Sequence, residues 1–149
     1  MELLDKLNLT RDTFDGRIAV VTGAARGIGE QVARALAHLG AHVVILDVRA
    51  TGEAVADQIN GDGGSAEFIE VDLTDLERLD AVQAAILESH SRVDILVNNA
   101  SKLHGVPFLE TPMALWDELY QTTVRASAFL ISKFLPVMTA NRFGVIADP

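Results

Sequence analysis

The sequence predicts an α/β fold built on a doubly wound parallel sheet, in which helices cover both faces. Two observations predict this fold. Short, nearly continuous apolar runs alternate with stretches of helical periodicity, and a cluster of glycines follows the first of these runs. An apolar run without polar alternation is typical of a strand that is buried on both faces of a parallel sheet. Because such strands are joined by right-handed crossovers, helices are expected on both faces.

The apolar runs define the expected elements in chain order. The first run is short and β-branched, and it leads through the glycine cluster into a helix that ends near Gly40. The glycine-rich segment 60–64 ends the second helix, and Thr74 with Glu77 forms a capping box for the third. A last helix is expected over 112–139, distorted near Pro136. The strands are expected at 18–21, 42–46, 68–71, 93–97 and 143–147.

The composition is that of one globular domain. The chain has 149 residues, of which 49% are hydrophobic and 22% charged, and it has no cysteine. A formal charge of −9 would repel the phosphates of nucleic acid and the headgroups of anionic lipids. Neither nucleic acid nor a membrane is therefore expected as a partner. The acidic start is unlike a secretory signal, which favours a cytoplasmic location. Residues 1–15 are interpreted as a leader and residues 16–149 as one nucleotide-binding domain.

The glycine cluster lies between the first strand and its helix, where a dinucleotide-binding turn is required. Its glycines allow a tight turn and let the backbone approach a pyrophosphate, and the first helical turn offers unpaired N–H groups to the anion. The expected fold is therefore of the Rossmann type. The residues expected to contact the cofactor here are Gly23, Ala25, Arg26, Gly27, Ile28 and Gly29.

Four ordered motifs resemble the classical short-chain dehydrogenase/reductase (SDR) family over roughly residues 14–149. They are Thr22-Gly23-Ala24-Ala25-Arg26-Gly27-Ile28-Gly29, then Asp72-Leu73, then Asn98-Asn99-Ala100-Ser101, and lastly Trp116 with Pro136, Met138 and Gly144. The resemblance implies a nicotinamide cofactor, with Asp72 and Leu73 at its adenine and Asn99 and Ala100 beside its nicotinamide ribose. It also implies hydride transfer to or from an alcohol or carbonyl substrate. Ser101 replaces the family's glycine, which would strain the loop if φ were positive there.

Two kinds of side chain compete over the choice of cofactor. Asp47, at the end of the second strand, is expected to accept hydrogen bonds from the free ribose hydroxyls of NAD and to repel the 2′-phosphate of NADP. Arg26 and Arg49 could pair with that phosphate. A carboxylate aimed at a dianion is a direct like-charge cost, whereas an exposed arginine contact is screened. NAD is therefore expected over NADP.

The resemblance also implies catalytic residues that this chain does not contain. In the family a Ser and a Tyr-x-x-x-Lys pair move the proton, assisted by an Asn in the preceding helix. Tyr120, the only tyrosine, is followed four places later by Val124, and Thr123 falls at the Asn position. We therefore expect this chain to be the N-terminal cofactor-binding half of such an enzyme, truncated after about five strands and lacking the C-terminal catalytic part. By itself it is expected to catalyse no hydride transfer.

Two interpretations of function stay open. The first is the NAD(P)-binding portion of an SDR-type oxidoreductase, and the second is a non-enzymatic NAD-binding or regulatory module, or half of a two-chain assembly. A nucleotide-sugar epimerase or reductase of the extended family is disfavoured, because its turn usually has a different glycine spacing. The helix expected over 112–139 carries apolar residues over more than one stripe, which predicts a homo-oligomer formed through it.

The four histidines do not have the spacing of a zinc site, so no metal is expected. They are His38, His42, His90 and His104. His104 and Lys102 follow the fourth strand, where they would border a substrate cleft.

Overall fold

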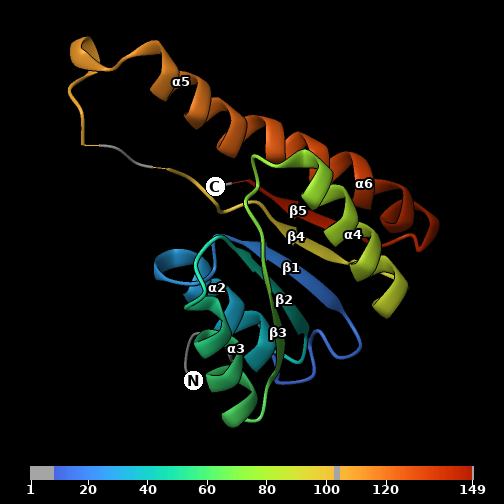
Figure 1. The fold of residues 1–149 in the computed structure, drawn as a ribbon. Helices are drawn as coiled ribbons and strands as arrows, with labels where there is room; N and C mark the ends of the chain where they lie inside the picture. Colours follow the sequence, from blue (N-terminus) through green and yellow to red (C-terminus); the bar gives the residue numbers. More distant parts are fainter. Residues whose placement is uncertain (1–8, 103–104, 149) are drawn as a thin grey trace.

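A computed structural model describes residues 9–102 and 105–148, and its centre is a five-stranded parallel sheet with the order β3-β2-β1-β4-β5 (Figure 1). The strands are β1 (Ile18–Thr22), β2 (His42–Asp47), β3 (Ser65–Glu70), β4 (Ile95–Val97) and β5 (Val145–Ala147). The helices are α2 (Gly27–His38), α3 (Gly52–Gly61), α4 (Leu76–His90), α5 (Met113–Tyr120) and α6 (Ala126–Ala140). The predicted parallel α/β architecture is confirmed.

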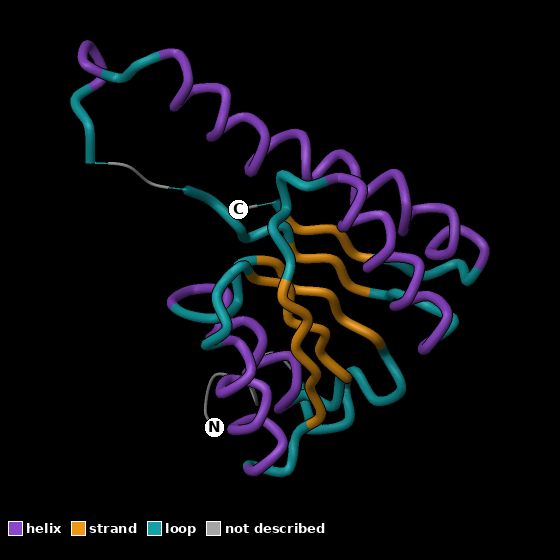
Figure 2. Tube along the Cα trace, in the orientation of Figure 1, coloured by secondary structure: helices purple, strands orange, loops and turns teal. Residues whose placement is uncertain are grey.

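Helices lie on both faces of the sheet, as Figure 2 shows. Alternate strand residues point to opposite faces: Val21 and Ile45 belong to one apolar cluster, whereas Val20 and Leu46 belong to the other. The first cluster contains the apolar faces of α2 and α3, and the second contains those of α4 and α6. Because both faces are covered, the central strands carry uninterrupted apolar residues, which explains the runs in the sequence.

The strand order reverses between β1 and β4. From β1 the chain moves outward through β2 to β3, and it then returns to pair β4 with the other side of β1. In an open parallel sheet the crevice at the carboxyl ends of such strands is the usual place for a ligand. The topology therefore puts a candidate site at the ends of β1, β2 and β4.

The capping box predicted for the third helix is wrong. Helix α4 is capped by Asp75, whose carboxylate accepts the backbone N–H of Arg78 at 3.0 Å. Thr74 instead donates its backbone N–H and its hydroxyl to the carboxylate of Asp72. Because the Thr74 hydroxyl is bonded to Asp72, it does not cap the helix, and the cap falls one residue later, at Asp75.

The long C-terminal helix is irregular at a different place from the one predicted. A π-helical stretch, Gln121–Arg125, joins α5 to α6, and α6 continues through Pro136 to Ala140. A π-helical turn inserts an extra residue into the helix. The side chains after the turn therefore point in other directions than they would in a continuous α-helix.

The segment before β1 packs against the rest of the described structure through Phe14. The backbone N–H of Phe14 donates to the carbonyl of Leu39 at 2.8 Å, and the Phe14 ring contacts the cluster beneath α2 and α3. No helix in the described ranges is long and apolar enough to cross a membrane.

Asp94 joins three strands at their amino ends. Its fully buried carboxylate accepts hydrogen bonds from the backbone N–H of Ile18 at 3.0 Å and from the guanidinium groups of Arg17 and Arg92 at 2.5–3.1 Å. Its backbone N–H donates to Ile18, and its carbonyl accepts from Val145. Burial alone would raise the pKa of Asp94, but the donors from Arg92, Ile18 and Arg17 together hold this pKa below its ordinary value of 3.8.

Replacing Asp94 with Asn is expected to lower the free energy of unfolding by about 1–3 kcal/mol, because the variant leaves two arginines without their buried anion. Both arginines are about one-third exposed, which keeps the loss below that of a fully buried pair. A depressed carboxyl pKa adds stability above the unfolded value and loses it as the pH falls through the folded value. Urea unfolding should therefore show a smaller loss of stability below pH 3.8 in Asp94→Asn than in the unaltered chain. Equal acid sensitivity of the two proteins would contradict the assignment.

Candidate functional site

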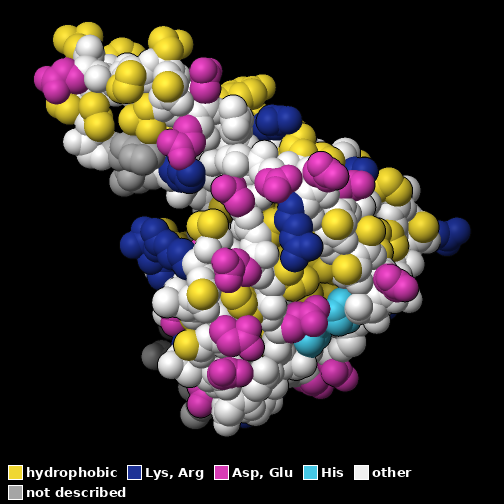
Figure 3. All heavy atoms as spheres, in the orientation of Figure 1, with side chains coloured by type: hydrophobic (Ala, Val, Ile, Leu, Met, Phe, Trp, Pro, Cys, Tyr) yellow, Lys and Arg dark blue, Asp and Glu magenta, His cyan; other side chains and the backbone are white. Residues whose placement is uncertain are grey.

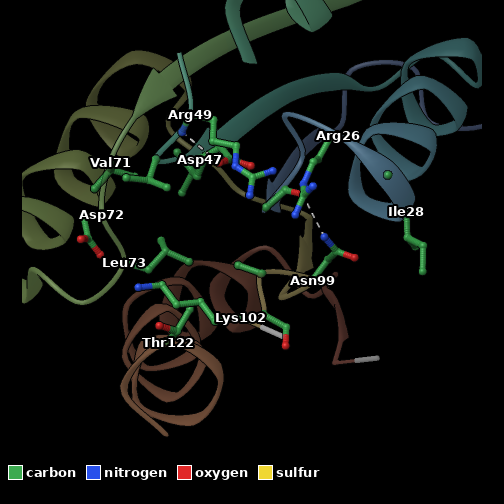
Figure 4. Close-up of a pocket in the computed structure, with 16 residues that line it drawn as sticks. Arg26, Ile28, Asp47, Arg49, Val71, Asp72, Leu73, Asn99, Lys102 and Thr122 are labelled. Carbon is green, nitrogen blue, oxygen red and sulfur yellow. Dashed lines mark hydrogen bonds between the residues drawn. The ribbon is translucent and has the colours of Figure 1, made fainter. Parts of the chain in front are cut away.

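A cavity of about 390 Å³ lies at the carboxyl ends of β1, β2 and β4, where the topology predicts a ligand (Figure 4). It is lined by three groups of residues: the loop after β1, the ends of β2 and β3, and the segment from the end of β4 to Lys102, with Thr122 from the π-helical turn. Every residue that the sequence predicts for the cofactor lines this cavity except Ala25 and Gly29, which are buried and do not line it.

The loop between β1 and α2 requires glycine at three positions for two different reasons. Gly23 and Gly27 have φ angles of +66° and +63°, which other residues rarely adopt. Gly29 has ordinary backbone angles, but a Cβ atom there would lie 2.4 Å from the side-chain amide of Asn99 and 2.5 Å from the carbonyl of Gly23. The helix can therefore start against the loop only if residue 29 has no side chain.

Two side chains hold this loop against the end of β4. The amide of Asn99 donates to the carbonyls of Thr22 at 3.0 Å and Gly23 at 3.1 Å. The hydroxyl of Thr22 accepts the backbone N–H of Ala100 at 3.0 Å. The backbone that faces the cavity is thus fixed by side chains from two loops, and the first turn of α2 opens directly onto it.

Asp47 already has hydrogen-bond partners from the protein. One carboxylate oxygen accepts the backbone N–H of Ala25 at 3.0 Å, and the other accepts that of Arg49 at 3.0 Å. Each carboxylate oxygen can accept a further hydrogen bond, so the residue can still receive a hydroxyl from the cavity. In Figure 4 Arg26 and Arg49 lie on the Asp47 side of the cavity. This end of the cavity therefore presents two cations beside one buried anion.

Asp72 borders the other side of the cavity mouth. Its carboxylate accepts the backbone N–H of Thr74 at 2.9 Å and the Thr74 hydroxyl at 2.8 Å. The Thr74 backbone hydrogen bond lowers the pKa of Asp72, although partial burial opposes it, and the charge of Lys102 lowers it further. Asp72 is thus ionised at neutral pH, and it presents an acceptor at the end of β3.

The far end of the cavity contains Lys102, which the sequence predicts beside a substrate cleft, and Thr122, which the sequence does not single out. Thr122 is buried, lines the cavity, and donates its hydroxyl to the carbonyl of Glu118 at 3.0 Å. Thr123, at the position where the resemblance implies Asn, is exposed and does not line the cavity. Lys102 lines the cavity and forms an ion pair with Glu118. Only the helical phase of the π-turn could have distinguished Thr122 from Thr123, and that turn has no simple sequence signal.

Two further expectations concern the loop after β4. Among the described non-glycine residues, positive φ angles occur at Ser91 and Arg142, so Ser101 is not strained there. Ser101 instead lines the cavity. His104 lies outside the described residues.

The profile of the short chain dehydrogenase family matches residues 17–148. The curated relatives include a 7alpha-hydroxysteroid dehydrogenase of Escherichia coli, 37% identical over 134 residues, which cover 89% of this chain and 52% of that protein. Oxidoreductase UcpA of Salmonella typhimurium is 40% identical over 131 residues, covering 88% of this chain and 50% of that protein. The chain therefore spans about half the length of the curated relatives it matches.

Solved structures of the same kind superimpose well. A metagenomic short-chain oxidoreductase in complex with NADP has a TM-score of 0.85 at 38% identity, covering 90% of this chain and 62% of that one. A Beutenbergia cavernae protein with NADP bound at low occupancy has a TM-score of 0.83 at 38% identity, covering 92% of this chain and 55% of that one.

Replacing Gly29 with Ala is expected to lower the free energy of unfolding by about 1–3 kcal/mol, because the added methyl group forces Asn99 and the β1–α2 loop apart. Gly61→Ala is the matched control, since a Cβ there meets nothing within 4 Å. The control should be neutral or slightly stabilising, because alanine favours a helix more than glycine does. Urea unfolding monitored by circular dichroism measures both variants. Equal free energies of unfolding for the two variants would show that the close approach at Gly29 does not affect the stability of the protein.

Proposed function

Because the chain belongs to the short-chain dehydrogenase family, we propose that the cavity binds a nicotinamide dinucleotide and that residues 16–149 form its binding domain. The observation that carries the proposal is the glycine loop after β1, whose three glycines leave the backbone bare where the first turn of α2 opens onto the cavity. Unpaired N–H groups at a helix start, with no side chain in the way, suit a pyrophosphate.

The remaining contacts are proposed from the family resemblance, and the positions of the lining residues along the cavity support them. The pyrophosphate is assigned to the loop formed by Gly23, Ala25, Arg26, Gly27, Ile28 and Gly29. Asp47 would accept from the adenosine ribose, and Asp72 with Leu73 would border the adenine. Asn99 and Ala100 would lie beside the nicotinamide ribose, and Lys102 and Thr122 lie beyond them, where a substrate would approach.

The proposed chemistry of the whole protein is that of an oxidoreductase. A bound nicotinamide supplies or accepts a hydride, and an alcohol or carbonyl compound is the substrate class. The residues described above bind and orient the dinucleotide, and none of them is assigned as the group that moves the substrate proton. This activity is proposed for a protein of which the chain covers the cofactor-binding part.

The cofactor proposed is NAD. Asp47 is held in place by two backbone N–H groups, so its carboxylate cannot turn away from a 2′-phosphate without losing those hydrogen bonds. Arg26 and Arg49 lie on the same side of the cavity and reduce the repulsion that NADP would meet. A fixed buried charge acts through a lower effective dielectric constant than two exposed arginines do, which favours NAD.

Exchange of Asp47 for Asn is expected to shift the ratio of NADH to NADPH affinity toward NADPH by about tenfold, because the charge is removed while the side-chain shape is kept. Fluorescence titration of NADH and NADPH measures both constants without requiring turnover. Arg26→Gln is the opposing control and should weaken NADPH binding more than NADH binding. An unchanged ratio in Asp47→Asn would remove Asp47 from the ribose site.

A second copy of the chain is the partner that we propose for α5 and the turn after it. One face of α6 is buried, through Ala126, Leu130, Phe134 and Met138. Met113, Trp116, Tyr120 and Val124 recur at helical spacing, and each is 40–72% exposed. In Figure 3 hydrophobic side chains gather at the end of the molecule that carries α5. An apolar stripe of this kind suits an isologous interface between two copies of the chain. As a separate proposal, the protein acts in the cytoplasm.

Introducing a charge into this stripe is expected to reduce self-association. Val124→Glu should shift the protein toward the monomer in sedimentation velocity, because a carboxylate would have to be buried at the contact. Gln31→Glu adds the same charge on the exposed side of α2 and should leave the association unchanged. A protein that is monomeric at all concentrations before any substitution would refute the proposed interface.

A further inference from the structure

Three potential metal ligands meet near the amino end of the β2–β3 pair, away from the cavity. His42 is the first residue of β2, Glu67 lies on β3, and His90 is the last residue of α4. Their ligand atoms all lie within 4.8 Å of one another. In Figure 3 histidine side chains, coloured cyan, lie beside acidic side chains on the visible face. These residues play no part in the proposed dinucleotide site.

The distances between the ligand atoms of this cluster are similar to the ligand–ligand distances of a zinc site, one being shorter and one longer. The Nε2 atom of His90 lies 2.7 Å from Oε1 of Glu67, and Nε2 of His42 lies 3.8 Å from the same oxygen. Two ligand atoms bound tetrahedrally at about 2.0–2.1 Å from zinc are separated by about 3.3 Å. Small rotations of the side chains would therefore bring all three atoms to bonding distance from one ion.

The orientation of His42 leaves one of its two ring nitrogens available to bind a metal ion. Its Nδ1 atom is 2.7 Å from the hydroxyl of Ser65, which is its register partner on β3. That hydrogen bond leaves Nε2 to face Glu67 and His90. The Nε2 atom is buried and has no hydrogen-bond partner among the residues that the structure describes. In a metal-bound histidine, the ring nitrogen that does not bind the metal usually forms a hydrogen bond, and this bond fixes the orientation of the imidazole.

We propose that His42, Glu67 and His90 bind a divalent transition-metal ion, with zinc as the type. Two imidazoles and one carboxylate form a borderline set of ligands that suits Zn²⁺, and it is poor for Ca²⁺ and Mg²⁺, which prefer oxygen alone. Glu67 is 41% exposed, so water can reach a fourth coordination position. The ion would join β2, β3 and the end of α4.

The alternative is an ordinary hydrogen-bonded pair between His90 and Glu67, with His42 as a neighbour. That pair accounts for the 2.7 Å contact, but it leaves the buried Nε2 atom of His42 without a partner. A metal ion accounts for all three groups and for the orientation of His42 by Ser65. The two interpretations differ in whether His42 binds an ion together with Glu67 and His90.

Titration calorimetry of the tag-free 149-residue chain with Zn²⁺ tests the proposal. We expect one equivalent to bind, and we expect Co²⁺ at the same site to give the intense visible absorption of a tetrahedral complex. His42→Gln, His90→Gln and Glu67→Gln should each weaken zinc binding by about tenfold or more. His38→Gln, at an exposed histidine of α2, is the matched control and should bind zinc unchanged.

Zinc should also raise the temperature of thermal unfolding of the unaltered chain and of His38→Gln, and should raise it less in Glu67→Gln. Circular dichroism without metal establishes that each variant is folded, and Ser65→Ala, which removes only the supporting hydrogen bond, provides a milder variant. The proposal is overturned if no stoichiometric binding occurs at a metal excess of about tenfold, or if folded His90→Gln and Glu67→Gln bind zinc as the unaltered chain does. NADH affinity measured in the same variants reports separately on the dinucleotide site.

Discussion

The close approach between the first turn of α2 and the loops after β1 and β4 is the constraint on which the candidate site depends. Gly29 has no room for a Cβ atom because the Asn99 amide and the Gly23 carbonyl occupy that space. The same amide bonds the Thr22 and Gly23 carbonyls, and Thr22 in turn accepts the N–H of Ala100. One compact set of contacts therefore fixes the end of β1, the start of α2 and the exit of β4 together.

The two ends of the sheet use charged groups differently. At the carboxyl end, Asp47 and Asp72 are held by backbone N–H groups and still border a cavity, so their charges are available to a ligand. At the amino end, the Asp94 carboxylate is fully buried and shared among two arginines and a backbone N–H, so its charge is used to join strands. Exposure to the cavity therefore distinguishes Asp47 and Asp72 from the buried Asp94, although all three are aspartates.

Local sequence predicted most of the parts of the cavity because those parts depend on short-range chemistry. Positive φ at Gly23 and Gly27, an acid at the end of β2 and an amide after β4 can each be recognised within a window of a few residues. The choice between Thr122 and Thr123 could not be recognised in this way. It depends on the π-helical turn at Gln121–Arg125, which rotates the residues that follow relative to a regular helix.

The sequence by itself determined the order of strands and helices, the glycine turn, the family resemblance and the apolar faces, because periodicity and turn chemistry act between near neighbours. Only the tertiary structure decided that His42, Glu67 and His90 meet. The parallel register sets Ser65 opposite His42 and Glu67 opposite Val44, and the length of α4 then carries His90 to the same edge. No spacing rule relates residues 25 and 23 positions apart, because their meeting depends on strand pairing and helix packing.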